Sequence, residues 1–117
     1  GDRAASGAQM MENFNFFGAP HVAIVTSGRE LGAYGAMDCG GFVTAFSLAA
    51  QALGIARVAP AAIASYSPIV RSHFDISEDR IILCAISFGY EDTAHPANSF
   101  RTNRATLDEI LDIRGDA

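Results

Sequence analysis

The chain contains no lysine, so all eight of its basic side chains are arginines. Against them stand 13 acidic residues, which leaves a net charge of −5 at pH 7. Because a nucleic-acid surface needs a basic excess, this balance argues against a nucleic-acid partner. A guanidinium fork matches phosphate or carboxylate geometry better than a lysine point charge does, so the few arginines are candidates for holding an anion.

Long apolar runs and a signal peptide are also missing. A membrane span needs about 20 apolar residues in a row, and the longest candidate, residues 40–58, is broken by polar side chains. Residues 1–7 lack the basic region and apolar block of a signal peptide. The only two cysteines, Cys39 and Cys84, have no partners at metal-binding spacing. We therefore expect no membrane partner, structural roles for both cysteines and a reducing, cytoplasmic setting.

The side chains of the common catalytic sites are not arranged for catalysis. His21, His73 and His95 show no metal spacing, and no serine lies in a nucleophile elbow. No pair of carboxylates resembles a general acid and base. We therefore predict no metal site and no catalytic side chain. If the protein is an enzyme, a bound cofactor supplies the chemistry.

Half of the 117 residues are hydrophobic, which indicates a globular chain of one domain, residues 1–117. The apolar and turn patterns predict helices over 2–16, 38–53 and 67–74 and from Thr106 onward, buried strands over 21–26 and 80–88, and loops over 27–36, 55–66 and 91–98. Ser67 is the expected cap of the third helix, and Thr106 is the expected cap of the last one, where Glu109 would complete a capping box. Two strands make a marginal sheet. Because the first residue is also not methionine, we expect a further segment or a partner chain to complete the fold.

The helix over 38–53 is apolar on nearly every face. Asp38 is its expected cap, and Gly54 is its expected left-handed terminator. A helix that is apolar all round is normally buried on every side. We therefore predict that it is either central in the domain or packed against a partner subunit.

Two segments are candidates for ligand binding. The small-residue loop 57–64 would let its backbone approach a flat ligand closely, although by composition alone a plain connection between helices explains it better. Arg101 and Arg104 lie three positions apart just beyond a predicted strand, where they suit a phosphate, although exposed arginines are commonly only solvated.

In order along the chain, several motifs resemble the C-terminal half of the nitroreductase family of flavoproteins. They are Phe16-Phe17-Gly18-Ala19-Pro20, Met37-Asp38-Cys39-Gly40-Gly41-Phe42, Leu48-Ala49-Ala50-Gln51-Ala52-Leu53-Gly54-Ile55, Val70-Arg71, Ile76-Ser77-Glu78-Asp79, Ala85-Ile86-Ser87-Phe88-Gly89-Tyr90 and Pro96-Ala97-Asn98-Ser99-Phe100-Arg101-Thr102-Asn103-Arg104-Ala105-Thr106-Leu107-Asp108-Glu109. Each motif is weak alone, but their order and spacing are typical of the family.

The resemblance implies an α+β nitroreductase-like fold, with a mixed or antiparallel central sheet flanked by helices. It implies an obligate homodimer with FMN at the subunit interface, NAD(P)H as hydride donor, and a nitroaromatic, quinone or similar small molecule as electron acceptor. The family's N-terminal half carries an Arg/Ser-rich segment that grips the cofactor, and nothing in residues 1–36 resembles it. The resemblance thus implies an incomplete fold here, completed by a missing N-terminal segment and a dimer partner.

The same resemblance assigns cofactor-binding residues. Arg104, and less directly Arg101, match the cations at the FMN phosphate. The loop Val58-Ala59-Pro60-Ala61-Ala62 matches the one that packs on the flavin ring, where the amide of Ala61 or Ala62 would donate toward N5; Pro60 has no amide to donate.

Two alternatives stay open. One is a non-catalytic dimerisation or interaction module that uses the apolar helix 38–53. The other is a relative on the same flavin fold with a different reaction, such as dehalogenation or flavin destruction.

Overall fold

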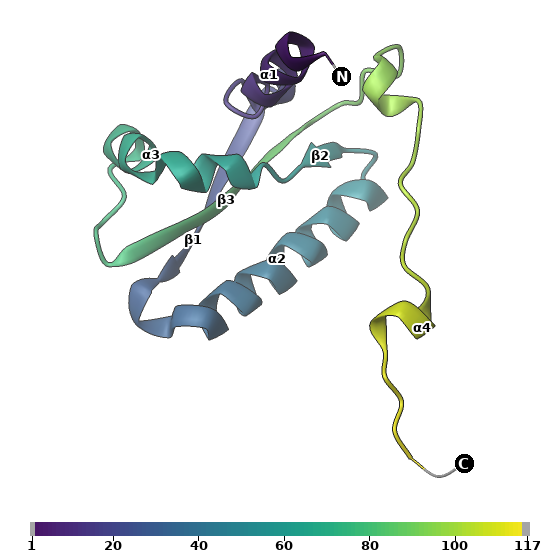
Figure 1. Cartoon of the computed structure of the whole chain (residues 1–117). Helices are drawn as coiled ribbons and strands as arrows, with labels where there is room; N and C mark the ends of the chain where they lie inside the picture. The colour runs from purple at the N-terminus through teal and green to yellow at the C-terminus, as the bar shows by residue number, and fades with distance from the viewer. Residues whose placement is uncertain (1, 116–117) are drawn as a thin grey trace.

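A computed structural model describes residues 2–115 and shows an α+β arrangement around a three-stranded sheet (Figure 1). The strands are β1 (His21–Gly28), β2 (Ala56–Val58) and β3 (Arg80–Gly89), and the α-helices are α1 (Arg3–Met11), α2 (Gly32–Ala52), α3 (Ser67–Phe74) and α4 (Leu107–Ile110). Short 3₁₀ helices are η1 (Phe16–Gly18), η2 (Arg29–Leu31), η3 (Ala61–Tyr66) and η4 (Pro96–Asn98). The predicted α+β class is confirmed.

β3 is the central strand, with β1 and β2 antiparallel on either side. The register pairs His21 with Phe88 at one end of β1, and Val58 of β2 with Ser87. A register shift between Val25 and Thr26 marks an irregularity in the β1–β3 ladder. Both predicted strands are confirmed. β2 was not predicted, because its region was expected to be a loop.

The first face of the sheet carries the main hydrophobic core. Ile82 and Ala85 of β3 pack there with Ile63 of η3, and all three are buried. Partly buried side chains surround them, namely Phe14, Phe16, Val22, Ile24, Val70 and Ile76. These residues come from positions 14 to 85, so this face ties the N-terminal segment, η3 and α3 to the sheet.

The long helix α2 covers the opposite face. Near its start, a Cβ added to Gly35 would overlap Oγ of Ser27 in β1, so the helix backbone lies directly on the strand there. Further along, the ring of Phe46 meets that of Phe88 in β3 at a centroid distance of 5.4 Å. The helix thus crosses the sheet from β1 to the far end of β3 (Figure 1).

The predicted start of this helix was wrong. α2 begins at Gly32, so Asp38 lies inside it and does not cap it, and Ser27 and Gly28 belong to β1 and not to a loop. Glycine weakens a helix in isolation, which is why the sequence predicted a loop here. Contact with β1 through Gly35 stabilises these first turns. At the other end, Gly54 has the expected left-handed φ of 70°.

The expected burial of α2 on every side is not met within this chain. Its buried residues are Gly35 and Ala50, whereas Phe42 is 56% exposed and Leu48 67% exposed. The sheet covers one side of the helix and leaves the other side open. The second form of the prediction, in which a partner subunit covers the open side, stays a prediction.

The two ends of the chain differ from the sheet in their packing. Asp2 caps α1 by accepting hydrogen bonds from the amides of Ala4 and Ala5, at 3.0 and 3.1 Å. After β3 the chain runs through η4 into an extended tail that leaves the body of the molecule and contains α4 (Figure 1). No helix among the described residues 2–115 is both long and apolar enough to cross a membrane.

Two details of the short helices refine the predictions. The cap of α3 is Tyr66 and not Ser67, which is its first helical residue and is followed by Pro68. The predicted pairing of Thr106 with Glu109 is confirmed, since the Glu109 carboxylate accepts from the Thr106 amide at 2.7 Å. This hydrogen bond lowers the pKa of Glu109.

Candidate functional site

The loop from Val58 to Ala62 leaves the edge strand β2 and is fastened to β3 at two points. The carbonyl oxygen of Pro60 accepts a hydrogen bond from the amide of Ala85 at 3.2 Å. The hydroxyl of Ser87, which is 1% exposed, donates to the carbonyl oxygen of Val58 at 3.4 Å. Because both carbonyl groups point to the sheet, the loop backbone is held on the edge of a rigid element.

The amides that follow this anchor are uncapped. Ala61 and Ala62 are the first two residues of η3, and the first amides of a helix have no partner inside it. Pro60, the cap residue, provides no side-chain acceptor. Ala59 and Ala61 are exposed, Ala62 is half-buried, and only Pro60 is buried. The loop therefore presents small side chains and free donors to an outside ligand.

These features fit a flat, polar-edged ring such as a flavin. Small side chains let a planar group approach the backbone, and uncapped amides can donate to its ring nitrogen and oxygen atoms. Val58, at 44% exposed, adds an apolar surface beside them. Of the predicted site residues, the structure brings together the five of the loop, and nothing in the loop's packing blocks a ligand from its outer side.

The structure places the other two predicted residues on the tail. The Arg101 guanidinium donates to the carbonyl oxygens of Asn98 and Phe100, at 2.8 and 2.9 Å, and lies 3.5 Å from a carboxylate oxygen of Glu91. Arg104 donates to the hydroxyl of Thr102 at 2.7 Å. Both bind local groups in this chain, and no hydrogen bond among the described residues joins either arginine to the loop 58–62.

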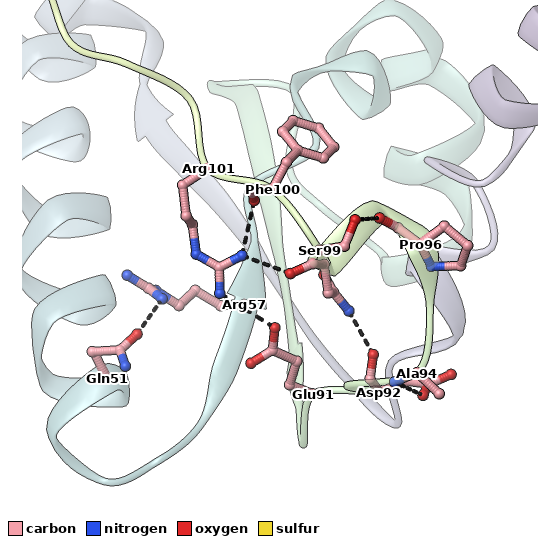
Figure 2. A network of polar contacts seen from close by, with 10 residues as sticks. Gln51, Arg57, Glu91, Asp92, Ala94, Pro96, Ser99, Phe100 and Arg101 are labelled. Atoms are coloured by element: carbon pink, nitrogen blue, oxygen red, sulfur yellow. Dashed lines mark hydrogen bonds and ion pairs between the residues drawn. The ribbon is translucent and has the colours of Figure 1, made fainter.

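Arg57 belongs to the candidate loop 57–64 and directly precedes residues 58–62, but no role was predicted for it. Its guanidinium donates to Oε1 of Gln51 in α2 at 3.0 Å, and its side chain is half-buried. Figure 2 shows the Arg57 guanidinium pointing toward Gln51 of α2. In a chain without lysine, an arginine immediately before a small-residue loop was the signal that could have identified it.

A hollow of about 580 Å³ lies beside α3, and the two arginines that line it, Arg29 and Arg71, both donate to backbone carbonyl oxygens. Arg71 donates to the carbonyl oxygens of Ile76 at 3.1 Å and Arg80 at 2.8 Å, and also to that of Ser77. Its side chain is 13% exposed. Arg71 therefore fastens the turn between α3 and β3, and its donors are taken by the backbone.

Each of the three histidines makes a local structural contact. His21 opens β1 and stacks on Phe88, with ring centroids 5.5 Å apart, and Nδ1 of His95 accepts from the amide of Ala97 at 3.2 Å. His73 meets the edge of Phe74. Within the described part of the chain, no three His, Cys, Asp or Glu side chains gather as metal ligands would.

A family model described as "Nitroreductase family" matches residues 2–90, which is most of the chain and includes β1, α2, the loop 58–62 and β3. The chain belongs to the nitroreductase family. The match confirms the family expected from the ordered motifs, and the loop with uncapped amides lies inside it.

Curated nitroreductases resemble the chain over most of its length. It is 36% identical over 104 residues to a 4-nitrobenzoate reductase of Nocardioides sp. (strain LMS-CY), a match that covers 89% of the chain and 42% of the relative. It is 38% identical over 98 residues to nitroreductase NfnB of Mycolicibacterium smegmatis, covering 84% of the chain and 42% of the relative.

A solved nitroreductase has the same fold. The FMN- and NADPH-dependent nitroreductase NfnB of Sphigopyxis sp. strain HMH superposes with a TM-score of 0.92 at 28% identity, and the match covers 98% of this chain and 52% of that one. The fold is therefore that of a nitroreductase. The chain spans about half the length of the relatives that it matches. These similarities do not favour a non-catalytic interaction module.

Proposed function

We propose that the protein containing this chain is an FMN-dependent oxidoreductase that takes hydride from NAD(P)H and reduces nitroaromatic, quinone or similar acceptors. The observation that carries the proposal is the loop 58–62, whose carbonyl groups are anchored to β3 while the amides of Ala61 and Ala62 are uncapped. Family membership and the names of the relatives support the cofactor and the reaction class.

In this proposal, Ala59, Pro60, Ala61 and Ala62 contribute through their backbone groups and their small side chains. The amide of Ala61 or Ala62 donates toward flavin N5, and the small side chains of Ala59 and Ala61 keep the backbone open to the ring. Pro60 has no amide, so it acts through its carbonyl group, which holds the loop on β3. When bound, FMN would accept hydride from NAD(P)H and pass electrons to the acceptor.

Arg104 is the proposed phosphate ligand, with Arg101 as a second cation. Both are on the extended tail, and each now donates to oxygens of nearby residues. A phosphate dianion would compete well for these guanidinium groups, because charge-assisted hydrogen bonds are stronger than those to neutral carbonyl oxygens.

We further propose that the cofactor lies between two copies of the protein, with the missing N-terminal segment of the same protein completing the site. The open side of α2 supports this assembly, since Phe42, Leu48 and Leu53 would otherwise present a large apolar surface to water. A reducing, cytoplasmic setting fits the two free cysteines.

The test is the visible absorption spectrum of the complete gene product after purification with added FMN. The proposal expects bound flavin absorbance that NAD(P)H bleaches under anaerobic conditions and that a nitroaromatic acid such as 4-nitrobenzoate restores. A protein that stays colourless with excess FMN would overturn it. If flavin binds but no nitro compound restores the absorbance, the cofactor assignment stands and the acceptor class is wrong.

A further inference from the structure

Cys39 and Cys84 open onto the same small hollow between α2 and the sheet. It has a volume of about 270 Å³, and its other lining residues include the small residues Ala36, Gly40 and Ala59. Neither cysteine is in a disulfide, and both are half-buried. Two thiols far apart in the sequence thus face one space that no side chain fills.

The backbone brings the two cysteines close in three ways. The Sγ atom of Cys39 lies 3.7 Å from the carbonyl oxygen of Thr26 in β1. The residue before Thr26, Val25, is directly opposite Cys84 in the ladder. One helical turn before Cys39, Gly35 lets α2 lie directly on β1. One turn beyond this close contact, Cys39 therefore projects from α2 toward the strand pair that carries Cys84.

A disulfide needs Cα atoms about 4.4–6.8 Å apart and a sulfur rotamer that points each thiol to the other. Both thiols line the one hollow, and its unfilled volume of about 270 Å³ gives the Cys39 side chain space to change rotamer. Burial, and after it the nearby Cys39 sulfur, raise the pKa of the Cys84 thiol.

We propose that Cys39 and Cys84 are a reversible oxidative modification site that closes to an intrachain disulfide in the presence of hydrogen peroxide. One thiolate attacks the peroxide, so that an S–O bond forms, the O–O bond breaks and water leaves after protonation. The other thiolate then attacks the sulfenic sulfur, forming the S–S bond and releasing the second water. The two sulfurs together lose two electrons, and the peroxide gains them.

The modification would tie α2 to β3 across the hollow, next to Ala59. Transient disulfides of this kind are the form in which cytosolic proteins use cysteine pairs. The proposal does not depend on bound flavin, because its readouts are thiol content and peptide mass.

The absence of lysine makes the test simple, since trypsin can cut this chain only after arginine. Cys39 is then carried by the peptide 30–57 and Cys84 by the peptide 81–101. The complete protein is treated with hydrogen peroxide, its remaining thiols are alkylated, and the digest is mapped without reductant. We expect the two peptides to be linked, the chain to lose both titratable thiols, and dithiothreitol to restore them.

A mixture of ¹⁵N-labelled and unlabelled protein separates intrachain from interchain linkage. Linked peptides of one isotope only support the proposal, and mixed pairs in statistical amounts overturn it. Unlinked peptides carrying sulfinic acid, or two thiols that survive the peroxide, also overturn it. Cys39→Ser and Cys84→Ser are the controls, because each must keep one thiol and lose the linked pair. The wild-type map decides the question even if a variant fails to fold.

Discussion

Gly35 of α2 lies so close to Ser27 of β1 that a Cβ atom on the glycine would overlap the serine hydroxyl and come within 2.7 Å of Cβ of Leu31. Ser27 is 5% exposed, so its hydroxyl cannot move out into water without disturbing the strand. This contact sets how closely the long helix approaches the sheet.

Gly35→Ala should therefore destabilise the protein, although alanine favours a helix by about 1 kcal/mol over glycine. Forcing a methyl group into this contact should cost about 1–3 kcal/mol net, measured as the free energy of unfolding in urea. Gly41→Ala is the matched control in the same helix. Its Cβ would meet nothing within 4 Å, so it should be neutral or stabilising. Equal effects of the two substitutions would contradict the contact.

Removing the Arg71 side chain should loosen the turn before β3. Arg71→Ala leaves the carbonyl oxygens of Ile76, Ser77 and Arg80 without their donor, and hydrogen bonds to a charged group are each worth about 1.5–3 kcal/mol. We expect a loss of about 2–3 kcal/mol in chemical denaturation. Arg114→Ala, which removes an exposed arginine paired with Asp112, should change stability by less than about 0.5 kcal/mol.

Two consecutive phenylalanines in η1 have left-handed backbone angles, with φ of 51° at Phe16 and 55° at Phe17. Glycine adopts such angles without strain, whereas other residues pay about 1–2 kcal/mol. Phe17 is 37% exposed, so Phe17→Gly should leave the melting temperature near that of wild type or raise it. Phe16 packs against the core, and Phe16→Gly should lower stability by about 1–3 kcal/mol. A larger loss at Phe17 than at Phe16 would show that strain is not important here.

Burial, with a smaller contribution from Cys39, raises the pKa of Cys84 above its ordinary value of 9.0. The folded state therefore holds this proton more tightly than the unfolded state. The resulting stability is complete below the unfolded pKa and is lost as pH rises through the folded value. In reducing buffer, the wild-type protein should lose stability above about pH 9 more steeply than Cys84→Ala. Parallel pH profiles for the two proteins would contradict the shift.

If Arg104 holds the FMN phosphate, Arg104→Ala should weaken FMN binding by about 1.5–3 kcal/mol, the usual worth of a charge-assisted contact. Fluorescence titration of the complete apoprotein with FMN measures the change, and Arg114→Ala is the control from the same tail. Riboflavin, which lacks the phosphate, should bind both variants and wild type alike. Unchanged FMN affinity in Arg104→Ala would remove this arginine from the site.

The sequence predicted the long strands and missed the short one for a physical reason. β1 and β3 each carry a continuous apolar run, which is a local signal. β2 has only Ala56, Arg57 and Val58, and it exists because these residues pair with Ser87, Phe88 and Gly89 of β3. No local pattern marks a three-residue strand whose stability comes from a partner about 30 positions away.

In the candidate site, too, the sequence revealed residue types but not the contacts between separate elements. Small residues at 58–62 and the paired arginines of the tail were visible as residue types, and motif order added the family. The anchoring of Pro60 by Ala85, and the link from Arg57 to Gln51, depend on where β3 and α2 lie and could not be read from the loop alone. The seven predicted site residues stay predictions until a cofactor is tested.

The sequence by itself determined the two main strands, the left-handed turn at Gly54, the pairing of Thr106 with Glu109 and the family, because these depend on neighbouring residues and on motif order. Tertiary structure alone decided that α2 begins at Gly32, that β2 forms, and that Cys39 and Cys84 share one hollow. Each of these depends on contacts between different helices and strands, where close packing outweighs the local preferences of the residues involved.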